Sequence, residues 1–556
     1  YDKNKIVLLN RYNECYGDNK VYIKIVQENE NIFYEYNSPK DVGNVDISEF
    51  KSISCEIELE PNEEIKLAFV IGVEDDDKND SIEDYEKEFV EVKNNWQEML
   101  NVLQVKTPDK QINIMLNGWL IYQTLVSRLL GRASFYQSGG AFGFRDQLQD
   151  SLALLYINPE LTKKQIIYHA EHQFIEGDVL HWWHPEKDNG IRTRYTDDLL
   201  WLVYVTNEYI KSTGDYEILD IETSYIEGKI LDDNESESYI QTEKSKIKES
   251  IYEHCKKAID RSFNYGPNGL PQIGSGDWND GMNKVGIKGK GTSVWLGFFL
   301  YMILDEFKDI LKKYRKEDVS KYEEFLNKLK TSLNTNAWDK DYYLRAFFDD
   351  GNTLGSCLND ECKIDLISQS FSILSNVIEP NRIESVINSV EELLVDKNLR
   401  IIKLLTPGFE YSSNNPGYIM DYPKGIRENG GQYTHSTAWY IMALIKIGRK
   451  DLAYEYYKMI NPINRSTTKK DVKTYKVEPY VIAADIYSNE DNEARGGWTW
   501  YTGSSGWFYN VGITEILGIK KCGKELRFNP SIPKDWDTFE VEYNYLETLY
   551  KIKVNV

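Results

Sequence analysis

A short acidic loop, residues 274–283, brings together side-chain types that can do chemistry on a sugar. Its sequence, GSGDWNDGMN, places two carboxylates, a tryptophan and an amide within four positions, with glycine on both sides. Glycine lets the backbone bend close to a ligand. Asp277 and Asp280 offer an acid and a hydrogen-bond acceptor, and Trp278 offers a flat apolar face that can stack on a sugar ring. The alternative interpretation is a polar turn that caps a helix.

A second glycine-rich cluster, residues 132–150, contains the sequence Phe-Arg-Asp. Arg145 and Asp146 could make paired hydrogen bonds to neighbouring hydroxyl groups of a sugar. They could equally form an ion pair at the start of a helix that begins at Asp146. The sequence leaves both interpretations open.

Histidine and tryptophan gather in the run 181–185, HWWHP, which is followed by an arginine-rich and acidic run, 192–201. His181 and His184 have a spacing that a metal site can use. No cysteine or HExxH context supports such a site, so we expect no bound metal. We interpret the run instead as an aromatic platform with polar edges.

A further cluster, residues 496–507, offers hydroxyl and backbone N–H groups around Thr502 and Gly503, just before a predicted helix. Helix N-termini bind anions because their N–H groups are unpaired and the helix dipole is positive there. With Arg132 and His435 as cationic donors, a phosphate could be held. The alternative is an ordinary helix cap.

Composition excludes several classes of partner. The 556 residues carry a net charge of −23, and the pI is about 4.9, which argues against nucleic acid and anionic membranes as partners. The 40 tyrosines and 13 tryptophans suit carbohydrate recognition, although most must fill a core. No apolar run reaches the roughly 18 residues of a membrane span, and the scattered cysteines form no CxxC pair. We therefore expect a cytoplasmic protein with free thiols. Because the chain opens in mid-strand on Tyr1, we expect it to be a fragment of a longer protein.

The hydrophobic pattern divides the chain into four regions. Residues 1–75 alternate in the manner of strands, and residues 76–108 form an acidic connector and a polar helix that runs to about Val105. Residues 109–520 contain about a dozen runs of helical period, which predicts an all-α layered solenoid or toroid rather than a β/α barrel. Residues 521–556 return to strands and predict a hairpin.

Three local predictions follow from the same patterns. The apolar run 65–73 predicts a buried strand. The charged stretch 225–248 predicts an exposed insertion, and the period of residues 244–264 predicts a helix.

Taken in their order along the chain, the clusters resemble those of glycoside hydrolase family 94, the inverting phosphorylases that include the cellobiose phosphorylases. The similarity extends over nearly the whole chain, and the loop sequences are most similar to the phosphorylase domain of cyclic β-1,2-glucan synthases. The resemblance implies a mainly α fold: an (α/α)6 barrel, preceded by part of a β-sandwich domain and a helical linker, and followed by a small C-terminal β-layer.

The resemblance also implies roles for individual residues. The general acid is the second carboxylate of the Asp-Trp-Asn-Asp loop, Asp280. The sugar-binding residues that it implies are Arg145, Asp146, Trp278, Arg427 and Glu428. The phosphate-binding residues that it implies are Arg132, His435, Thr502 and Gly503. Disaccharide phosphorylases carry an arginine six residues before the aspartate of Phe-Arg-Asp, where this chain has Gly140, so we expect a different sugar subsite.

The implied reaction is reversible phosphorolysis of a β-linked gluco-oligosaccharide of β-1,2 or β-1,4 type. Asp280 would protonate the glycosidic oxygen while phosphate attacks the opposite face, giving α-glucose 1-phosphate. Phosphate is then a co-substrate, and no cofactor is expected. Trp278 and Asp277 would raise the pKa of Asp280, and Asp277 would orient the loop. The implied partners are the oligosaccharide, phosphate, the preceding part of the same protein and a second subunit in a homodimer.

Two other functions remain open. An inverting β-glucan hydrolase would need a second carboxylate as base, for which Glu428 is the candidate. A non-catalytic glucan-binding domain of a cyclic-glucan-synthase-like protein would bind sugar without turnover.

Overall fold

The computed structural model describes residues 5–9, 20–27, 33–37, 52–73, 81–130, 141–185, 188–500 and 503–555. The chain divides into two compact units, residues 1–99 and residues 100–556. Each unit is described by itself.

The first unit contains the predicted strands. An antiparallel sheet has the order β1 (Lys5–Leu9), β2 (Lys20–Gln27), β5 (Leu67–Val73). A separate hairpin joins β3 (Phe33–Asn37) and β4 (Ser52–Glu56), and the helix α1 (Ile82–Leu100) follows.

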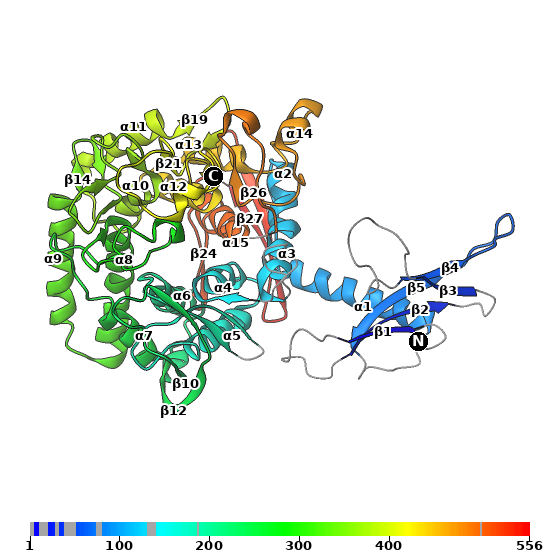
Figure 1. The fold of residues 1–556 in the computed structure, drawn as a ribbon. Coiled ribbons are helices and arrows are strands. Elements are labelled where there is room, and N and C mark those ends of the chain that lie inside the picture. Colours follow the sequence, from blue (N-terminus) through cyan, green and yellow to red (C-terminus); the bar gives the residue numbers. More distant parts are fainter. Residues whose placement is uncertain are drawn as a thin grey trace. The chain divides into compact units, whose positions relative to one another are not determined.

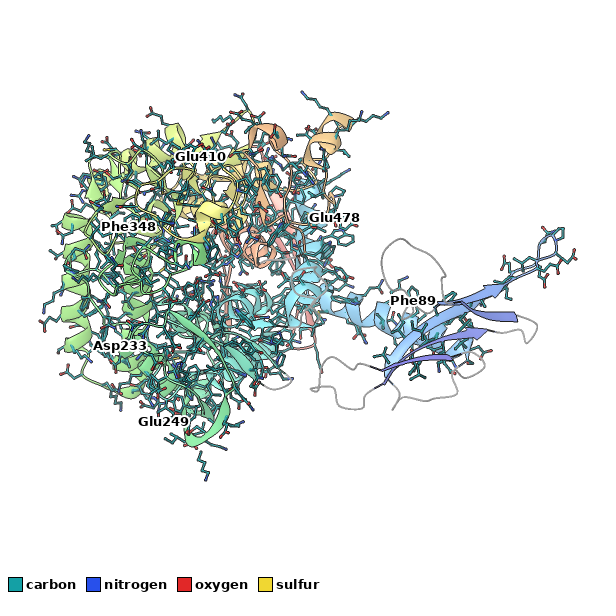
Figure 2. All side chains as sticks on the ribbon, viewed as in Figure 1. Phe89, Asp233, Glu249, Phe348, Glu410 and Glu478 are labelled. Carbon is teal, nitrogen blue, oxygen red and sulfur yellow. The ribbon has the colours of Figure 1, made fainter. Side chains whose placement is uncertain are left out.

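The run 65–73 contains the strand β5, which pairs with β2, but the prediction that this strand is buried is wrong. Phe69 and Ile71 are 61% and 73% exposed. Alternate side chains of a strand point to opposite faces, so these two share one uncovered face of the described sheet. Phe89 of α1 is likewise exposed (Figure 2).

Six helices of the second unit form a closed ring in which each contacts the next and the last contacts the first (Figure 1). In chain order they are α4 (Phe144–Ser151), α6 (Asp198–Thr213), α8 (Val294–Ile310), α10 (Leu366–Leu374), α12 (Thr434–Lys446) and α15 (Ser504–Asn510).

A second set of helices packs outside this ring, each against one or two of the inner helices. They are α3 (Leu120–Thr124), α5 (Pro159–Ala170), α7 (Ile251–Arg261), α9 (Ser320–Asn336), α11 (Ile383–Leu393) and α13 (Lys450–Ile460). The predicted helical, layered character of residues 109–520 agrees with this arrangement.

Aromatic side chains from different inner helices meet inside the ring. Trp201 of α6 lies 4.6 Å from Phe299 of α8 and 6.5 Å from Trp439 of α12, measured between ring centroids. Trp439 in turn lies 5.6 Å from Trp507 of α15 and 5.1 Å from Phe371 of α10. Rings of this size bury large apolar areas, so this cluster forms the core that holds the inner helices together.

Short strands lead into several inner helices. β7 (Phe142–Gly143), β13 (Thr292–Ser293), β18 (Ile364–Asp365) and β22 (Gln432–Tyr433) end at the residue before α4, α8, α10 and α12 respectively. The N-terminal turns of the inner helices and the segments before them therefore carry most of the residue clusters that the sequence singled out. The remaining elements include α2 (Lys110–Ile114), α14 (Lys469–Tyr475), β14 (Trp338–Asp339), β15 (Tyr342–Tyr343), β16 (Ala346–Phe347), β17 (Thr353–Leu354), β19 (Val395–Asp396), β20 (Ile401–Ile402), β21 (Leu405–Thr406) and β23 (Asp485–Ile486).

The predicted insertion and helix around residues 225–264 are partly wrong. Residues 243–250 form β12 (Glu243–Ser250), which pairs with β10 (Glu222–Glu227), and only residues 251–261 are helical. Tyr225 and Ile226 of β10 are buried. The lysine-rich sequence favours a helix locally, but strand pairing overrides that preference. A four-stranded sheet next to it has the order β11 (Glu237–Ile240), β9 (Asn189–Thr193), β8 (Leu180–His184), β7.

The predicted C-terminal hairpin is present as β26 (Thr538–Tyr545) and β27 (Thr548–Asn555). The predicted linker helix ends at Leu100 rather than Val105, because β6 (Leu103–Lys106) pairs with β26. A second hairpin joins β24 (Ile519–Cys522) and β25 (Glu525–Phe528). None of the helices in the described ranges has both the length and the apolar character needed to cross a membrane.

Candidate active site

The loop 274–283 takes a path that only glycine allows at two positions. Gly274 has φ +60°, and a Cβ there would lie 2.1 Å from the Arg194 carbonyl oxygen. Gly276 has φ +148°, and a Cβ there would lie 1.9 Å from the ring of Tyr195. Other residues are strained at such φ values and would clash, so these glycines let the loop pack tightly against residues 194–195.

Asp277 holds the loop from below. Its carboxylate, completely buried, accepts hydrogen bonds from Arg345 Nη2 at 2.6 Å and Nη1 at 2.7 Å, and from the Ser293 hydroxyl at 2.6 Å. It also accepts from the backbone N–H of Asn279 at 3.1 Å, which closes the turn before Asp280. This geometry agrees with the orienting role that the sequence suggested for Asp277.

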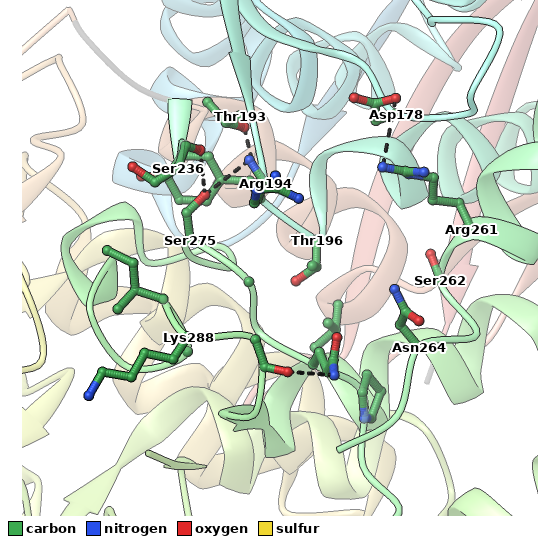
Figure 3. A pocket seen from close by; sticks show the side chains of 18 of the residues that line it. Asp178, Thr193, Arg194, Thr196, Ser236, Arg261, Ser262, Asn264, Ser275 and Lys288 are labelled. Atoms are coloured by element: carbon green, nitrogen blue, oxygen red, sulfur yellow. Dashed lines mark hydrogen bonds and ion pairs between the residues drawn. The ribbon is translucent and has the colours of Figure 1, made fainter. Parts of the chain in front are cut away.

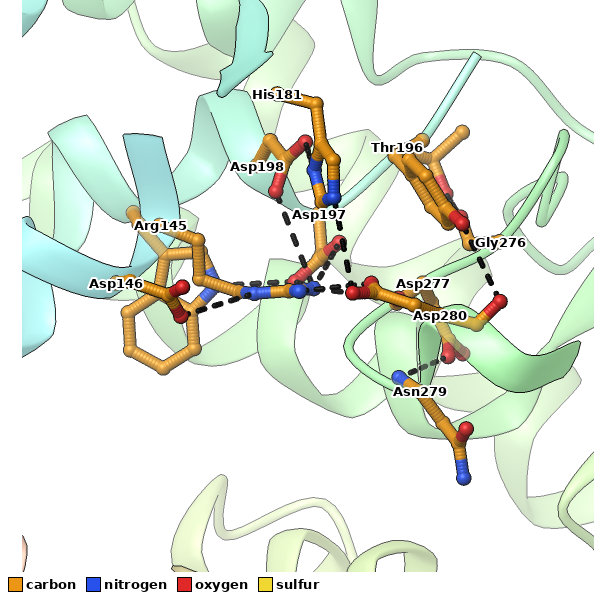
Figure 4. A network of polar contacts seen from close by, with 12 residues as sticks. Arg145, Asp146, His181, Thr196, Asp197, Asp198, Gly276, Asp277, Asn279 and Asp280 are labelled. Carbon is orange, nitrogen blue, oxygen red and sulfur yellow. Dashed lines mark hydrogen bonds and ion pairs between the residues drawn. The ribbon is translucent and has the colours of Figure 1, made fainter. Parts of the chain in front are cut away.

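Asp280 is the loop carboxylate that reaches solvent, with 30% of its side chain exposed. Arg145 Nη2 donates to its Oδ1 at 2.7 Å, and His181 Nε2 lies 3.6 Å from its Oδ2 (Figure 4). The Tyr195 hydroxyl donates to the Asp280 carbonyl oxygen at 3.2 Å. The loop acid thus sits between two basic side chains.

The expected rise in the pKa of Asp280 is not found. Burial raises this pKa, but the positive charges of Arg145 and His181 outweigh burial and hold it below its ordinary value. Burial alone would lower the pKa of His181, yet Asp198 and Asp280 hold it well above its ordinary range. These charges therefore favour an anionic Asp280 beside a cationic His181.

Arg145 contacts acidic residues rather than standing open to a ligand. Its side chain is almost fully buried, and Nη1 lies 3.2 Å from Asp197 Oδ2 while Nη2 binds Asp280. The ion pair with Asp146, one of the two interpretations left open, is long, at 4.0 Å from Nε to Oδ1. Asp146 itself is 41% exposed, so of the two side chains it is the more accessible to solvent.

Trp278 and His435 lie together above the aromatic core. The Trp278 ring, which is buried, lies 4.9 Å from Trp439 and 5.8 Å from His435. His435 is in the first turn of α12, and its Nδ1 lies 3.3 Å from the Ser504 hydroxyl at the start of α15. A Cβ on Gly503, the N-cap of α15, would lie 3.1 Å from His435 Nε2.

The first turns of α12 and α15 are therefore adjacent at the His435 imidazole, and the Asp150 carboxylate also lies next to Gly503. Of the four predicted phosphate residues, His435 and Gly503 are neighbours. Arg132 and Thr502 lie outside the described residues.

Arg427 and Glu428 form an ion pair, with Arg427 Nε 3.2 Å from Glu428 Oε2. The Arg427 guanidinium also lies 3.7 Å from the centre of the Trp498 ring, a cation–π contact. The Arg427 guanidinium lies 5.1 Å from the centre of the Tyr422 ring, and that ring lies 6.2 Å from the ring of Tyr418, between centroids. Tyr418 belongs to the 3-10 turn η11 (Tyr418–Asp421), which packs on η8 (Asp280–Met282). These contacts connect the Arg427–Glu428 pair to the turn that carries Asp280.

Sequence reasoning missed the residues that support the acid. Asp197, Asp198, His181 and Arg345 were not predicted as site residues, although the first three lie in runs that the sequence singled out. His181 Nδ1 lies 2.8 Å from Asp198 Oδ2, so the histidine is part of this network of acidic side chains. In the described part of the chain, no group of three or more His, Cys, Asp or Glu side chains is arranged to hold a metal ion.

A cavity of about 620 Å³ adjoins the loop but does not include Asp280 (Figure 3). Tyr195, Gly274 and Ser275 form part of its wall. Another part of the wall contacts the loop, because the Ser275 hydroxyl donates to the Ser236 carbonyl oxygen at 3.3 Å. The residue before β11 thus packs against the loop.

Comparison with known proteins places this geometry in a family. Residues 95–518 match the model of the glycosyl hydrolase 94 superfamily, catalytic domain. The chain is 44% identical over 462 residues to the cyclic beta-(1,2)-glucan synthase NdvB of Rhizobium meliloti (strain 1021), which aligns 83% of this chain with 16% of that protein. It is 28% identical over 543 residues to the N,N'-diacetylchitobiose phosphorylase of Vibrio proteolyticus, covering 90% and 64% of the two chains. It is 29% identical over 461 residues to the solabiose phosphorylase of Paenibacillus borealis, covering 82% and 56%.

The chain spans less than two thirds of the length of each of these relatives. The family match covers most of the chain, so the resemblance predicted from the motifs is confirmed. The chain belongs to the glycosyl hydrolase 94 superfamily.

Proposed function

We propose that this chain catalyses inverting phosphorolysis of β-linked gluco-oligosaccharides and releases α-glucose 1-phosphate. The observation that carries the proposal is the position of Asp280: a partly exposed carboxylate on a rigid loop whose Trp278 packs beside His435 at two helix N-termini. Relatives named as phosphorylases support the reaction type. The relative named as a cyclic β-1,2-glucan synthase favours the β-1,2 linkage, and the β-1,4 linkage is the alternative that the family resemblance implies.

In the proposed reaction, Asp280 gives its proton to the glycosidic oxygen as the bond from that oxygen to the anomeric carbon breaks. A phosphate oxygen attacks the same carbon from the opposite face and forms the new bond, which inverts the configuration. Phosphate is already an anionic nucleophile, so no second carboxylate is needed as base. No cofactor takes part, and phosphate is a co-substrate.

The proposed phosphate site is built from His435, Gly503, Arg132 and Thr502. His435 and Gly503 support it by their contact at the N-termini of α12 and α15, where backbone N–H groups and helix dipoles favour anions. Such groups would hold the nucleophile in line and stabilise negative charge in the transition state.

The proposed sugar site uses Asp146, Trp278 and the Arg427–Glu428 pair. Asp146 is exposed beside the acid network, and ring contacts connect the Arg427–Glu428 pair to the turn that carries Asp280. For Arg145 we propose a different role from direct sugar binding, because both of its terminal nitrogens are used by Asp197 and Asp280. It would hold the acid in place.

We further propose the domain organisation that the sequence suggested: a partial β-sandwich over residues 1–75, a linker over 76–108, an (α/α)6 barrel over 109–520 and a β-layer over 521–556. The closed ring of inner helices with a second set packed outside it supports the barrel. A homodimer and a cytoplasmic location belong to the same proposal.

The test is release of α-glucose 1-phosphate from β-1,2-, β-1,3- and β-1,4-linked glucose oligomers, with and without phosphate. We expect phosphate-dependent product, and we expect Asp280→Asn to lower its rate by about 10²- to 10⁴-fold, the usual contribution of a general acid. Asp309→Asn, at an exposed position near the end of α8, is the matched control and keeps the wild-type rate.

Other outcomes would replace the proposal. Free glucose released without phosphate would identify an inverting hydrolase, with Glu428 as the base to test next. Glucan binding without product at any phosphate concentration would identify a binding domain. Near-normal turnover by Asp280→Asn would contradict the assignment of the acid.

A further inference from the structure

His181, which has no role in the proposed reaction, lies between the carboxylates of Asp198 and Asp280. Its Nδ1 lies 2.8 Å from Asp198 Oδ2, and its Nε2 lies 3.6 Å from Asp280 Oδ2 (Figure 4). Its ring stacks on that of Tyr195, with centroids 4.6 Å apart. Asp198, His181 and Asp280 thus form a chain of two contacts that ends at the proposed acid.

We propose that His181 is the residue that returns a proton to Asp280 after each turnover, with Asp198 fixing its orientation. This inference rests on the proposed function, since it assumes that Asp280 is the general acid. His181 acts through Asp280 and does not touch the reacting atoms, so it is a positioning and proton-supplying residue rather than a catalytic one.

Proton balance shows why such a residue is needed. A glycoside and monohydrogen phosphate give a sugar phosphate dianion and an alcohol, so the proton lost by phosphate equals the proton gained by the leaving oxygen. Phosphate attacks one face of the sugar while Asp280 protonates the other face. The proton released by phosphate must therefore return to Asp280 by a path around the sugar or through solvent.

The geometry of His181 suits the last step of that path. Asp198 is completely buried and accepts from Nδ1, which keeps a proton on Nδ1 and points Nε2 toward Asp280, so that Nε2 carries the mobile proton in the cationic ring. In the transfer, the Nε2–H bond breaks and an O–H bond forms on Asp280. The neutral ring then takes a new proton on Nε2, since 16% of the His181 side chain is exposed. The 3.6 Å separation is longer than a hydrogen bond, and such contacts commonly shorten when substrate binds.

The surroundings of His181 are strongly charged. Groups from five parts of the chain act on it or on the side chains next to it: Arg145 in α4, Tyr195, Asp197 and Asp198 before and at the start of α6, Asp277 and Asp280 in the acid loop, Glu237 in β11 and Tyr418 in η11. The acidic groups in this set outnumber its one arginine, and their negative charge favours the protonated form of the His181 ring.

A coupled pair of this kind predicts a distinctive pH dependence. Between the two ionisations of the pair, Asp280 and His181 share one proton, and the fraction on Asp280 does not depend on pH. We therefore expect a plateau in the pH profile of kcat for phosphorolysis at saturating phosphate. Without the histidine, Asp280 titrates alone, and the rate falls about tenfold per pH unit above its pKa.

The experiment compares wild type, His181→Gln and the control His184→Gln. Glutamine keeps a side-chain amide donor but cannot carry a mobile proton. His184 lies on the same strand, with its ring against Trp182 instead of an acidic group. Each protein is assayed on a glucose oligomer and on a β-glucoside whose phenol leaves as an anion, across about pH 5 to 9, with thermal unfolding recorded as a folding check.

We expect His181→Gln to lose about 10- to 100-fold in kcat on the oligomer, less than loss of the acid itself, and to lose the plateau. On the activated glucoside, whose leaving group needs no proton, it should keep the wild-type rate, and His184→Gln should match wild type on both. If His181→Gln does not fold, Asp198→Asn is used, and it should shorten the plateau on its alkaline side.

An unchanged plateau, or equal losses on both substrates, would overturn the inference and leave His181 a structural residue. If wild type shows no phosphate-dependent product, the proposed function fails first. The two failures are therefore distinguishable.

Discussion

The buried ion pair beneath the acid loop gives a prediction whose size can be worked out from the structure. Arg345→Met removes a guanidinium that donates to both oxygens of Asp277, at 2.6 and 2.7 Å, and to the Ser293 hydroxyl at 3.2 Å. Methionine fills a similar length but carries no charge or donor. Asp277 is then left as an uncompensated carboxylate in a site with no solvent exposure, and the buried Asp365 carboxylate, 3.5 Å from Arg345 Nε, loses the same partner.

The expected cost is about 3–5 kcal/mol of unfolding free energy, the usual result of removing one partner of a buried pair. Two charge-assisted hydrogen bonds at roughly 1.5–3 kcal/mol each give a similar figure. Total stability is typically about 5–15 kcal/mol, so the variant loses a large share of it. Asp277 lies three residues before Asp280, and a displacement of about 1 Å at the reacting group would lower turnover about 10²-fold.

The assay is guanidinium unfolding followed by tryptophan fluorescence, together with α-glucose 1-phosphate release by the folded protein. Arg449→Met is the matched control: Arg449 pairs with Glu384 at the surface, and its loss should cost less than about 1 kcal/mol. Adding Asp277→Asn to Arg345→Met should recover part of the stability, because the unpaired charge of Asp277 is removed. It should not recover the activity. Loss of less than about 1 kcal/mol in Arg345→Met, with normal turnover, would refute the reasoning.

Two further predictions concern the same neighbourhood. Gly276→Ala should lower turnover about 10²-fold or more, because its Cβ would lie 1.9 Å from the Tyr195 ring and would push the loop away; wild-type kinetics in this variant would contradict the path of the loop. The raised pKa of His181 means that its contribution to stability is complete below the unfolded value of about 6.5 and is lost as pH rises through the folded pKa. The difference in unfolding free energy between wild type and His181→Gln should therefore shrink as pH increases above about 6.5, and a difference that grows would show the opposite linkage.

Many residues of the candidate site could be predicted from the sequence because they are concentrated in short segments. The carboxylates and tryptophan of residues 277–280 lie in one loop, and the groups proposed to bind phosphate precede or begin helices, where capping signals are local. The C-terminal hairpin was predictable for the same reason, since alternation and a turn are enough to specify it.

Contacts between distant residues were not predictable from these patterns. Arg145 and Asp280 are 135 positions apart, and Arg345 and Asp277 are 68 apart, yet their ion pairs determine the charge and position of the acid. No periodicity or motif connects such residues in a single sequence. The expected pKa of Asp280 was wrong for this reason: a nearby tryptophan was visible in the sequence, whereas a buried arginine and histidine were not.

The lowered pKa of Asp280 is consistent with the proposed acid catalysis once the charge of the co-substrate is considered. A negative charge about 6 Å from a carboxylate, at an effective dielectric constant of about 20, disfavours its ionised form by about 2.8 kcal/mol, or roughly two pKa units. A phosphate bound near Trp278 and His435 would oppose the effect of Arg145 and His181 in this way. Asp280 would then become a competent acid only when the nucleophile is present. Without phosphate the acid stays ionised, and water meets a glycosidic oxygen that cannot be protonated, so the same charges that hold Asp280 in place would also suppress hydrolysis.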